Sequence, residues 1–298
     1  MMKNIVLLIV AFFICIPPVD GAALKCSTCG KKRKKFLLTL QTARFCSKAC
    51  VPEDKKCTNC AGLLIGRFTK VTYGSNYGYY CMKCADAPRC SSCHLPIPQN
   101  DQKSIAGEIF CQKCAETLLT PAKASSLMRK IRQELKKAYG YDTAHQISLK
   151  LMDYKSITKL GNRHTVGLMK YELKRNETDK KDKDSKKAPK WQMKCEIYLL
   201  DTLSVNNAGQ VLAHELTHDY LFHHLGRTSN QAVCEGICEA IAAEWLLSKG
   251  KVADYEAKKQ NPDPIYGEGF RLIYPQLKRR GFKKMLEDNR HYFKPVIR

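Results

Sequence analysis

The sequence lacks an apolar run long enough to cross a lipid bilayer: its longest, residues 5–16, is shorter than the roughly 20 apolar residues that a spanning helix needs. Lys3 precedes this run, and two prolines and the small residues 21–23 follow it. That order is typical of a secretory signal peptide. We therefore expect residues 1–23 to be a signal peptide and the mature protein to be secreted or periplasmic, without a transmembrane domain. A retained N-terminal anchor is the alternative.

The chain is also poor in acidic residues. It has 28 Asp and Glu against 51 Lys and Arg, which gives a formal net charge of +23. The excess is concentrated at residues 31–35, 174–190 and 278–284. Such a surface favours anionic partners, although solvated basic faces are the ordinary interpretation. The charge therefore identifies no particular partner.

Cysteine, in contrast, is abundant, with 16 residues. Most of them form close pairs, namely Cys26/Cys29, Cys46/Cys50, Cys57/Cys60, Cys81/Cys84, Cys90/Cys93 and Cys111/Cys114. Each pair can present two thiolates to one tetrahedral metal, so successive pairs predict three structural four-cysteine zinc sites of the zinc-ribbon or treble-clef kind. Disulfides are the alternative in an oxidising compartment. A c-type haem attached at Cys90, Cys93 and His94 is another.

The cysteine groups divide the N-terminal part of the chain into two modules. The first group predicts a four-cysteine zinc module at residues 24–54, and the other two predict a double-zinc module at residues 55–120. The double module resembles a LIM domain with two departures. Position 81 is Cys where LIM domains usually have His, and five residues separate the two halves where two are usual.

A second metal pattern, HExxH, lies at His214, Glu215 and His218. On a helix, residues four apart share one face, so the two histidines can bind one zinc ion. Glu215 then lies beside them, where a general base for a zinc-bound water belongs. The alternative is a buried helix whose histidines are merely hydrogen-bonded.

The third ligand of this zinc has two candidate sources. His224 stands where the metzincin pattern has its last histidine, but position 221 is Leu instead of the Gly that turns the chain back. If the helix continues, His224 lies about 15 Å along the axis from the first histidine. A second helical pattern, residues 234–247, carries Glu235 and Glu239 one turn apart. We predict Glu235 as the third ligand, giving the two-histidine, one-glutamate site of a gluzincin, and Glu239 as a hydrogen-bonding partner of a ligand histidine.

The remaining patterns predict an α+β fold, in which a small sheet and an active-site helical subdomain form a gluzincin-type peptidase domain at residues 141–298. A helix at residues 121–140, opened by Thr120 and Pro121, links the zinc modules to this domain. The strand at 194–201 runs into the HExxH helix and, as an edge strand, would pair with a peptide substrate. Other expected elements are strands at 145–154 and 164–173, a mobile loop at 174–190, and helices at 253–259, 267–277 and 282–289.

Tyr266 is our candidate for a donor that stabilises the developing oxyanion. Gluzincins usually add a phenol or imidazole donor to the metal for this purpose. Gly267 and Gly269 follow it and would allow a close backbone approach to a cleft. The alternative is a tyrosine that covers a hydrophobic core, in which case His223 and Arg271 are the next candidates.

Several motifs together resemble the DA-one family of plant organ-size regulators. They are APRCSSC with CQKC after it, LAHELTH at residues 212–218, EGIC at 235–238 and YGEGF at 266–270. The similarity covers roughly Cys57 to the C-terminus. The resemblance implies a LIM-containing zinc peptidase of the gluzincin type. It also favours Glu235 as the ligand, because Glu235 matches the family's acid in EGIC whereas Glu239 falls where plant members carry Gln.

The chain departs from that family in three ways. It has an expected signal peptide and an extra four-cysteine module, and it has no ubiquitin-interacting segment, whereas the plant members are intracellular and activated by ubiquitination. We therefore predict an exported zinc metallopeptidase that hydrolyses protein or peptide substrates, with one catalytic and about three structural zinc ions. The alternative is a zinc-module scaffold protein with a latent or inactive peptidase domain.

Overall fold

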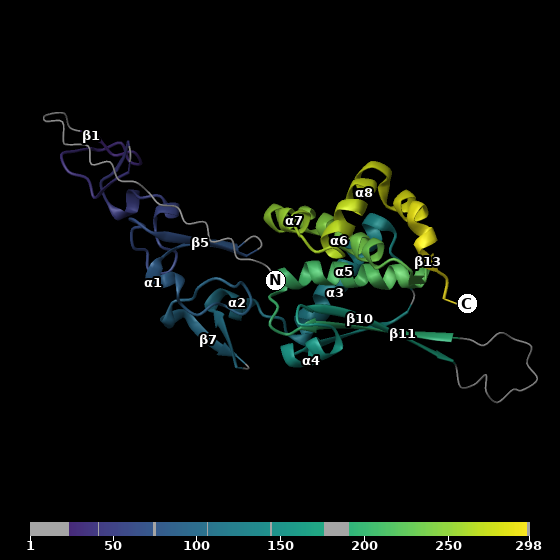
Figure 1. Cartoon of the computed structure of the whole chain (residues 1–298). Coiled ribbons are helices and arrows are strands. Elements are labelled where there is room, and N and C mark those ends of the chain that lie inside the picture. Colours follow the sequence, from purple (N-terminus) through teal and green to yellow (C-terminus); the bar gives the residue numbers. More distant parts are fainter. Residues whose placement is uncertain are drawn as a thin grey trace, which may run out of the picture. The chain divides into compact units, whose positions relative to one another are not determined.

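The computed structural model describes residues 24–296, apart from residues 41, 74–75, 106, 144 and 176–190. The expected signal peptide and nearly all of the expected mobile loop lie outside these described residues. The chain divides into two compact units, one ending at Ala115 and the other beginning at Glu116 (Figure 1). Among the described residues, no helix is long and apolar enough to cross a membrane.

The first unit is built from short antiparallel hairpins, three of them placed between two cysteine pairs and the first placed around the pair Cys26/Cys29. In the second and third cysteine groups, a hairpin ends at Cys81 or Cys111, and a short helix then carries Cys84 or Cys114. The elements are β1 Leu24–Lys25, β2 Lys32–Arg33, β3 Leu38–Leu40, β4 Ala43–Phe45, η1 Lys48–Cys50, η2 Glu53–Lys55, β5 Phe68–Tyr73, β6 Asn76–Cys81, α1 Met82–Ala85, η3 Gln99–Asp101, β7 Gln102–Ile105, β8 Glu108–Cys111 and α2 Gln112–Thr117.

These modules bury few apolar side chains. The first has a core of Leu38, Phe45 and Val51, and the second buries Leu64 and Tyr80 beside its cysteines. Such small cores rarely hold a domain together, and structural metals or disulfides usually compensate.

The second unit begins with α3 Pro121–Tyr139, which Thr120 caps by accepting a hydrogen bond from the backbone N–H of Lys123. Gly140 ends the helix in the left-handed conformation, with φ of 74°. The buried stripe of α3 packs against α5 Val205–His224 and β9 Ile147–Met152. The helix expected to link two domains is thus an integral part of the second unit.

The sheet of the second unit has the order β10-β11-β9, from β10 Gly167–Arg175, β11 Trp191–Leu200 and β9. β11 pairs antiparallel with β10 and parallel with β9, and α4 Tyr154–Leu160 follows β9. The expectation that residues 194–201 form an edge strand is therefore wrong. Cys195, Ile197 and Leu199 are each at most 1% exposed, and a strand this apolar and buried belongs at the centre of a sheet.

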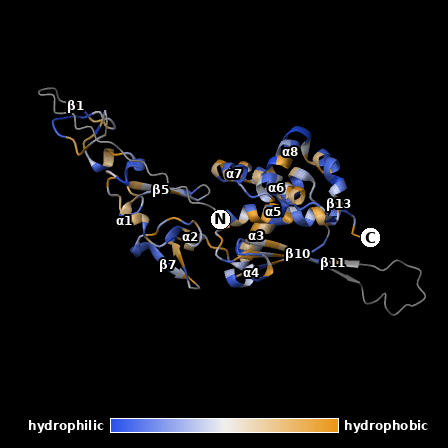
Figure 2. Cartoon of the chain, viewed as in Figure 1, coloured by the Kyte–Doolittle hydropathy of each residue, from blue (hydrophilic) through white to orange (hydrophobic). Residues whose placement is uncertain are grey.

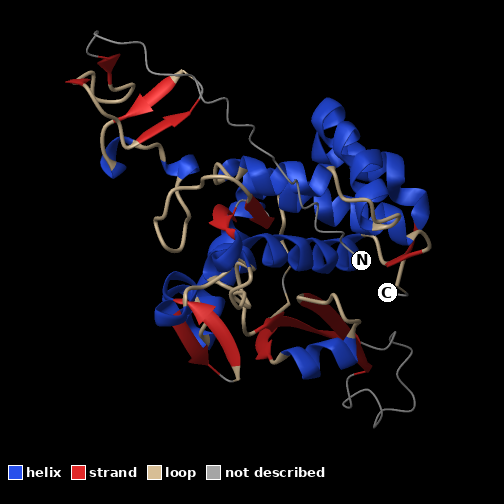
Figure 3. Cartoon of the chain, turned by 60° about the vertical axis from the view of Figure 1, so that its left-hand side comes forward, coloured by secondary structure: helices blue, strands red, loops and turns tan. Residues whose placement is uncertain are grey.

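Helices cover this sheet in successive layers. α5 lies on β10 and β11, α6 Gln231–Ser248 packs on α5, and α8 Tyr266–Asn289 packs on α6 (Figure 1). Figure 3 shows the same separation of strands and helices from a second side. α7 Val252–Lys259 contacts α6 and α8, and the remaining elements are η5 Arg290–Tyr292, β12 Arg227–Thr228 and β13 Phe293–Lys294.

The hydrophobic core of the unit lies along α6. Most of its side chains are buried, including Ile237, Ile241 and Leu246 at 0% exposure. The helices around it carry both hydrophobic and hydrophilic residues (Figure 2). α8 merges the two C-terminal helices that the sequence predicts. Gly281, with φ of 75°, is its non-helical residue and separates the two parts.

Two glycines let α6 and α8 cross at backbone contact. A Cβ atom at Gly236 would lie 2.3 Å from the carbonyl oxygen of Gly269, and one at Gly269 would lie 2.2 Å from the carbonyl oxygen of Ala232. Both distances are far below van der Waals contact. Gly236 of EGIC and Gly269 of YGEGF thus serve a helix crossing beside Glu235, whereas a Cβ atom at Gly267 would meet the carbonyl oxygen of Asn261.

Candidate metal centre

α5 and α6 bring three side chains to one point. Ser204 and Asn230 cap the N-termini of these helices, and each accepts a hydrogen bond from a backbone N–H three residues on. The Nε2 atoms of His214 and His218 lie 3.1 Å apart. The Oε2 atom of Glu235 lies 3.1 Å from the first and 3.3 Å from the second.

This triangle fits a metal better than a hydrogen-bond network. Tetrahedral zinc with bonds of about 2.0–2.2 Å separates its nitrogen and oxygen ligands by about 3.3–3.6 Å. The observed edges of 3.1–3.3 Å are close to that separation. Oε2 of Glu235 is buried and has no hydrogen-bond partner among the described residues. The three residues converge on a shared point, and their donor set suits zinc.

Burial and charge act in opposite directions on the Glu235 carboxyl group. Burial raises its pKa, but the two imidazoles outweigh this effect and hold the pKa below its usual range. The group is therefore ionised, as a metal ligand must be.

Each histidine has a further neighbour on α6. Nδ1 of His214 lies 2.9 Å from Oε1 of Glu239. Nδ1 of His218 lies 3.7 Å from Sγ of Cys234. The sequence predicted the first neighbour but not the second. Adjacent positions on a helix point about 100° apart, so the place of Cys234 directly before Glu235 is only a weak signal.

Two further side chains near the metal centre were not predicted. Lys258 of α7 places its Nζ atom 2.6 Å from Oε2 of Glu239. Cys238 is buried, and its sulfur lies within 4.8 Å of the ligand atoms of both histidines. Neither has a metal-ligand spacing in the sequence, so only the fold reveals them.

Glu215 lies beside this centre and faces β10. It is 5% exposed, and burial raises the pKa of its carboxyl group. The two nearby imidazoles, and the backbone N–H of Met169, which donates a hydrogen bond to it, partly offset this increase in pKa. A Cβ atom at Gly167 would lie 2.2 Å from Cγ1 of Val211 and 2.9 Å from Oε1 of Glu215. Only a glycine at the start of β10 lets the edge strand pass this close to the carboxylate.

Tyr266, the first oxyanion candidate, lies beside the metal centre. It is the first residue of α8, its ring centroid is 6.2 Å from that of His214, and it is 37% exposed. Burial, followed by the charges of Glu235 and Glu215, raises the pKa of its phenol, which therefore stays protonated. Arg271 instead donates to the backbone carbonyls of Asn261 and Lys259.

The two remaining histidine candidates lie at the C-terminal end of α5. The His223 ring lies 5.3 Å from the ring of His145. His224 places Nε2 3.3 Å from the carbonyl oxygen of Asp142, in keeping with its exclusion as a zinc ligand.

The family model for the DA1-like domain, described as Protein DA1, matches residues 122–261. This stretch belongs to the DA1-like family. Protein DA1 of Arabidopsis thaliana is 24% identical over 255 residues, covering 67% of this chain and 48% of the plant protein. Protein DA1-related 7 of the same plant is 26% identical over 121 residues, covering 29% of this chain and 22% of the relative.

The chain thus spans less than half the length of the curated relatives that it matches. No solved structure matches it significantly. The matched residues include all of the triangle, Glu215 and Lys258, and end before Tyr266. The resemblance seen in the sequence motifs is therefore confirmed.

Outside the DA1-like domain, the twelve paired cysteines form three groups of four, as the sequence predicted. Sulfur–sulfur distances within them are 3.6 Å for Cys29–Cys46, 3.7 Å for Cys46–Cys50, and 4.0 Å for both Cys60–Cys81 and Cys93–Cys111. A disulfide requires about 2.05 Å, whereas tetrahedral zinc with four bonds of about 2.3 Å separates its sulfurs by about 3.8 Å. The distances fit zinc, and every described cysteine is a free thiol. The grouping of Cys90 and Cys93 with Cys111 and Cys114 favours zinc over haem.

The same distance test argues against a metal at another buried group of the DA1-like domain. His145, Cys195 and Asp219 place possible ligand atoms within 4.8 Å of one another. Nε2 of His145, however, lies 2.6 Å from Oδ1 of Asp219, which is a hydrogen-bond distance. Oδ2 of Asp219 accepts a hydrogen bond from Thr143. This group is a satisfied buried carboxylate that joins α5 to the segment before β9.

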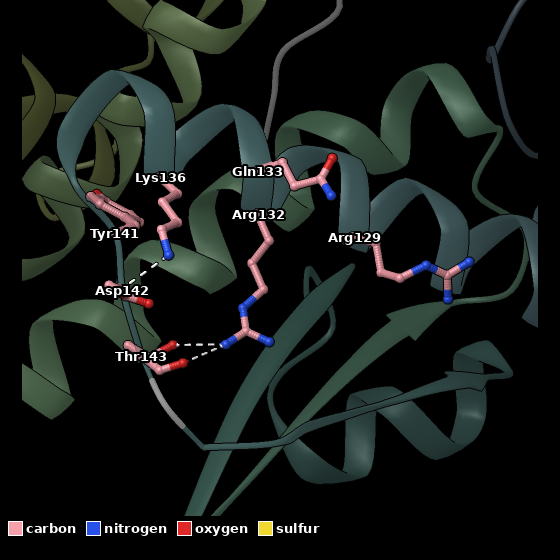
Figure 4. A pocket seen from close by; sticks show the side chains of 7 residues that line it. All are labelled: Arg129, Arg132, Gln133, Lys136, Tyr141, Asp142 and Thr143. Atoms are coloured by element: carbon pink, nitrogen blue, oxygen red, sulfur yellow. Dashed lines mark hydrogen bonds and ion pairs between the residues drawn. The ribbon is translucent and has the colours of Figure 1, made fainter.

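A surface pocket of about 280 Å³ lies over α3, away from the metal ligands (Figure 4). Arg132 bonds the backbone and side-chain oxygens of Thr143, and Lys136 lies 3.2 Å from Oδ2 of Asp142. The positively charged side chains of the pocket are thus largely engaged within the domain. It is lined by Arg129, Arg132, Gln133, Lys136, Tyr141, Asp142 and Thr143.

Proposed function

We propose that the protein is a zinc-dependent peptidase that hydrolyses protein or peptide substrates. The observation that carries this proposal is the convergence of His214, His218 and Glu235 at separations of 3.1–3.3 Å, with the Glu215 carboxylate beside them. Three protein ligands leave a fourth tetrahedral position for water or substrate, as in catalytic rather than structural zinc sites. Membership of residues 122–261 in the DA1-like family supports the proposal.

Each residue has a distinct role in this reaction. A zinc ion held by the triangle would polarise the peptide carbonyl and lower the pKa of water. Glu215 accepts the proton of the attacking water and then delivers it to the leaving amine nitrogen. The Tyr266 hydroxyl donates a hydrogen bond to the carbonyl oxygen as that oxygen becomes negative.

The substrate is proposed to bind as an extended strand along β10. This strand is the sheet edge next to Glu215, and its other side pairs with β11. An unpaired edge offers backbone N–H and C=O groups that bind a peptide without regard to its sequence. The role that the sequence assigned to residues 194–201 therefore passes to residues 167–175.

The location and partners of the protein are further proposals. The apolar run at residues 5–16 supports an exported, secreted or periplasmic protein. The four-cysteine modules are proposed to bind substrates or partners, and the basic surface is proposed to favour anionic ones.

Metal removal tests the proposed function. The purified protein should hold about four zinc ions and cleave a denatured proteome, and a strong chelator should abolish cleavage. Added zinc should restore it, because the ligands are preorganised on two buried helices. Cleavage that persists after the loss of all zinc would contradict the proposal.

Changing Tyr266 to Phe should lower kcat and kcat/KM together by roughly 100-fold. The hydroxyl acts on charge that develops only in the transition state, so zinc content and thermal unfolding should not change. Steady-state kinetics with one peptide substrate measures the effect. Full activity would remove Tyr266 from the mechanism and leave His223 and Arg271 to be tested.

A zinc-module scaffold with a latent peptidase is the second candidate function. It is favoured by exposed apolar side chains in the first unit, where Tyr77 is 61% and Ile65 54% exposed. The scaffold function would be supported over the peptidase if the zinc-loaded protein cleaves no substrate but binds partners in a way that depends on residues 26–114.

A further inference from the structure

Both oxygens of the Glu239 carboxylate are occupied, each by a different cation-forming side chain. Oε1 lies 2.9 Å from Nδ1 of His214, and Oε2 lies 2.6 Å from Nζ of Lys258. Glu239 is 9% exposed, so little water reaches it. Three helices thus meet at this carboxylate, α6 through Glu239, α5 through His214 and α7 through Lys258.

The Lys258 side chain is itself largely buried, at 17% exposure. Lys259, the next residue on α7, is 56% exposed, and its Nζ atom lies 3.8 Å from Oε2 of Glu256. An ammonium group that gives up most of its hydration needs a strong partner, and a carboxylate at 2.6 Å is one. The contact is thus specific to Lys258 and is not shared by its neighbour.

The contact also determines which oxygen of Glu239 faces the metal centre. With Oε2 held by the ammonium group, the carboxylate presents Oε1 to His214. A metal-binding histidine depends on such a neighbour at its second ring nitrogen, which fixes the ring orientation and raises its basicity as a ligand. Without Lys258, a buried carboxylate would lack a counter-charge and could turn away from the ring.

We propose that Lys258 is a positioning residue of the metal centre, which holds Glu239 against His214 and so strengthens zinc binding. This inference rests on the proposed function, since it assumes that His214 is a zinc ligand. Lys258 does not contact the metal, the water or the substrate.

The first test compares Lys258→Met with Lys259→Met. Methionine keeps an apolar stem and removes the charge. Chelator competition measures the zinc affinity of the site formed by the triangle. The zinc of this site is identified as the ion that a Glu235→Ala variant lacks. Lys258→Met should weaken zinc binding about tenfold, the lower end of the range for residues that act through a ligand. Lys259→Met should stay within about twofold of the wild type.

A double variant separates positioning from general packing. Glu239→Gln should weaken zinc binding about 10- to 100-fold. The glutamine amide would face the Lys258 ammonium group with N–H groups, and two donors do not form a hydrogen bond. If Lys258 acts only through Glu239, adding Lys258→Met should weaken binding no further and should relieve that donor–donor contact. The double variant also leaves no buried charge unpaired, so it carries the test if Lys258→Met alone does not fold.

A second readout is the division between kcat and KM at saturating zinc. A residue that positions a metal ligand should affect kcat and leave KM nearly unchanged. Losses of zinc affinity that multiply in the double variant, or equal affinities for the two lysine variants, would overturn the role of Lys258. Absence of any zinc beyond the four-cysteine sites in the wild type would instead overturn the proposed function.

Discussion

Changing Glu215 to Gln should lower kcat/KM by about 10²- to 10⁴-fold while the catalytic zinc stays bound. Glutamine has nearly the same shape, so it fits between α5 and Gly167, but its amide cannot accept the proton of the attacking water. Zinc content by native mass spectrometry and the rate of peptide cleavage measure the two parts of this expectation.

The stability of this variant gives an independent check. Burial raises the pKa of Glu215, so the metal-free folded state binds its proton more tightly than the unfolded chain does. That preference lowers stability as the pH rises through the unfolded-state pKa towards the folded-state value. At neutral pH, the metal-free Glu215→Gln variant should therefore be at least as stable as the metal-free wild type. Such a gain is expected where a functional residue reduces stability.

Glu268, an exposed residue on α8, is a suitable control. Glu268→Gln should keep full activity, since it removes a carboxylate of the same size at the surface. Undiminished turnover by Glu215→Gln would exclude Glu215 as the base. Loss of zinc from that variant would show that Glu215 also holds the site together.

The parts of the site that the sequence predicts are those set by local helical geometry. His214 and His218 are four residues apart, so any α-helix places them on one face. Glu235 follows from the same rule once a second helix is recognised. The four-cysteine groups are similar, because each short cysteine pair fixes two ligands before any tertiary contact forms.

The unpredicted parts depend on tertiary pairing. Lys258 and Lys259 look alike in the sequence, and only the packing of α7 against α6 distinguishes the buried lysine from the exposed one. The order of the strands depends on which of the later strands pairs with β9. A sequence pattern that locates a strand does not say whether one or both of its edges are paired.

Removing the third ligand should have a large effect on both zinc content and peptide cleavage. Glu235→Ala should reduce the zinc content from about four to about three ions and abolish peptide cleavage, because two histidines alone leave half of a tetrahedral shell without protein ligands. The three four-cysteine groups should keep their zinc, since none of their ligands lies in the second unit. Glu268→Ala serves as the control and should lose neither zinc nor activity.

Cys238 makes this prediction sharper, because its sulfur lies within 4.8 Å of the ligand atoms of both histidines. A thiolate is a good zinc ligand and could replace the missing carboxylate. The double variant Glu235→Ala/Cys238→Ala resolves this. If the single variant keeps a fourth zinc and the double variant loses it, the sulfur can hold the ion, and low activity of the single variant would then reflect a changed ligand set. If both variants keep four zinc ions, neither Glu235 nor Cys238 is needed to hold the fourth ion, and Glu235 is not a ligand.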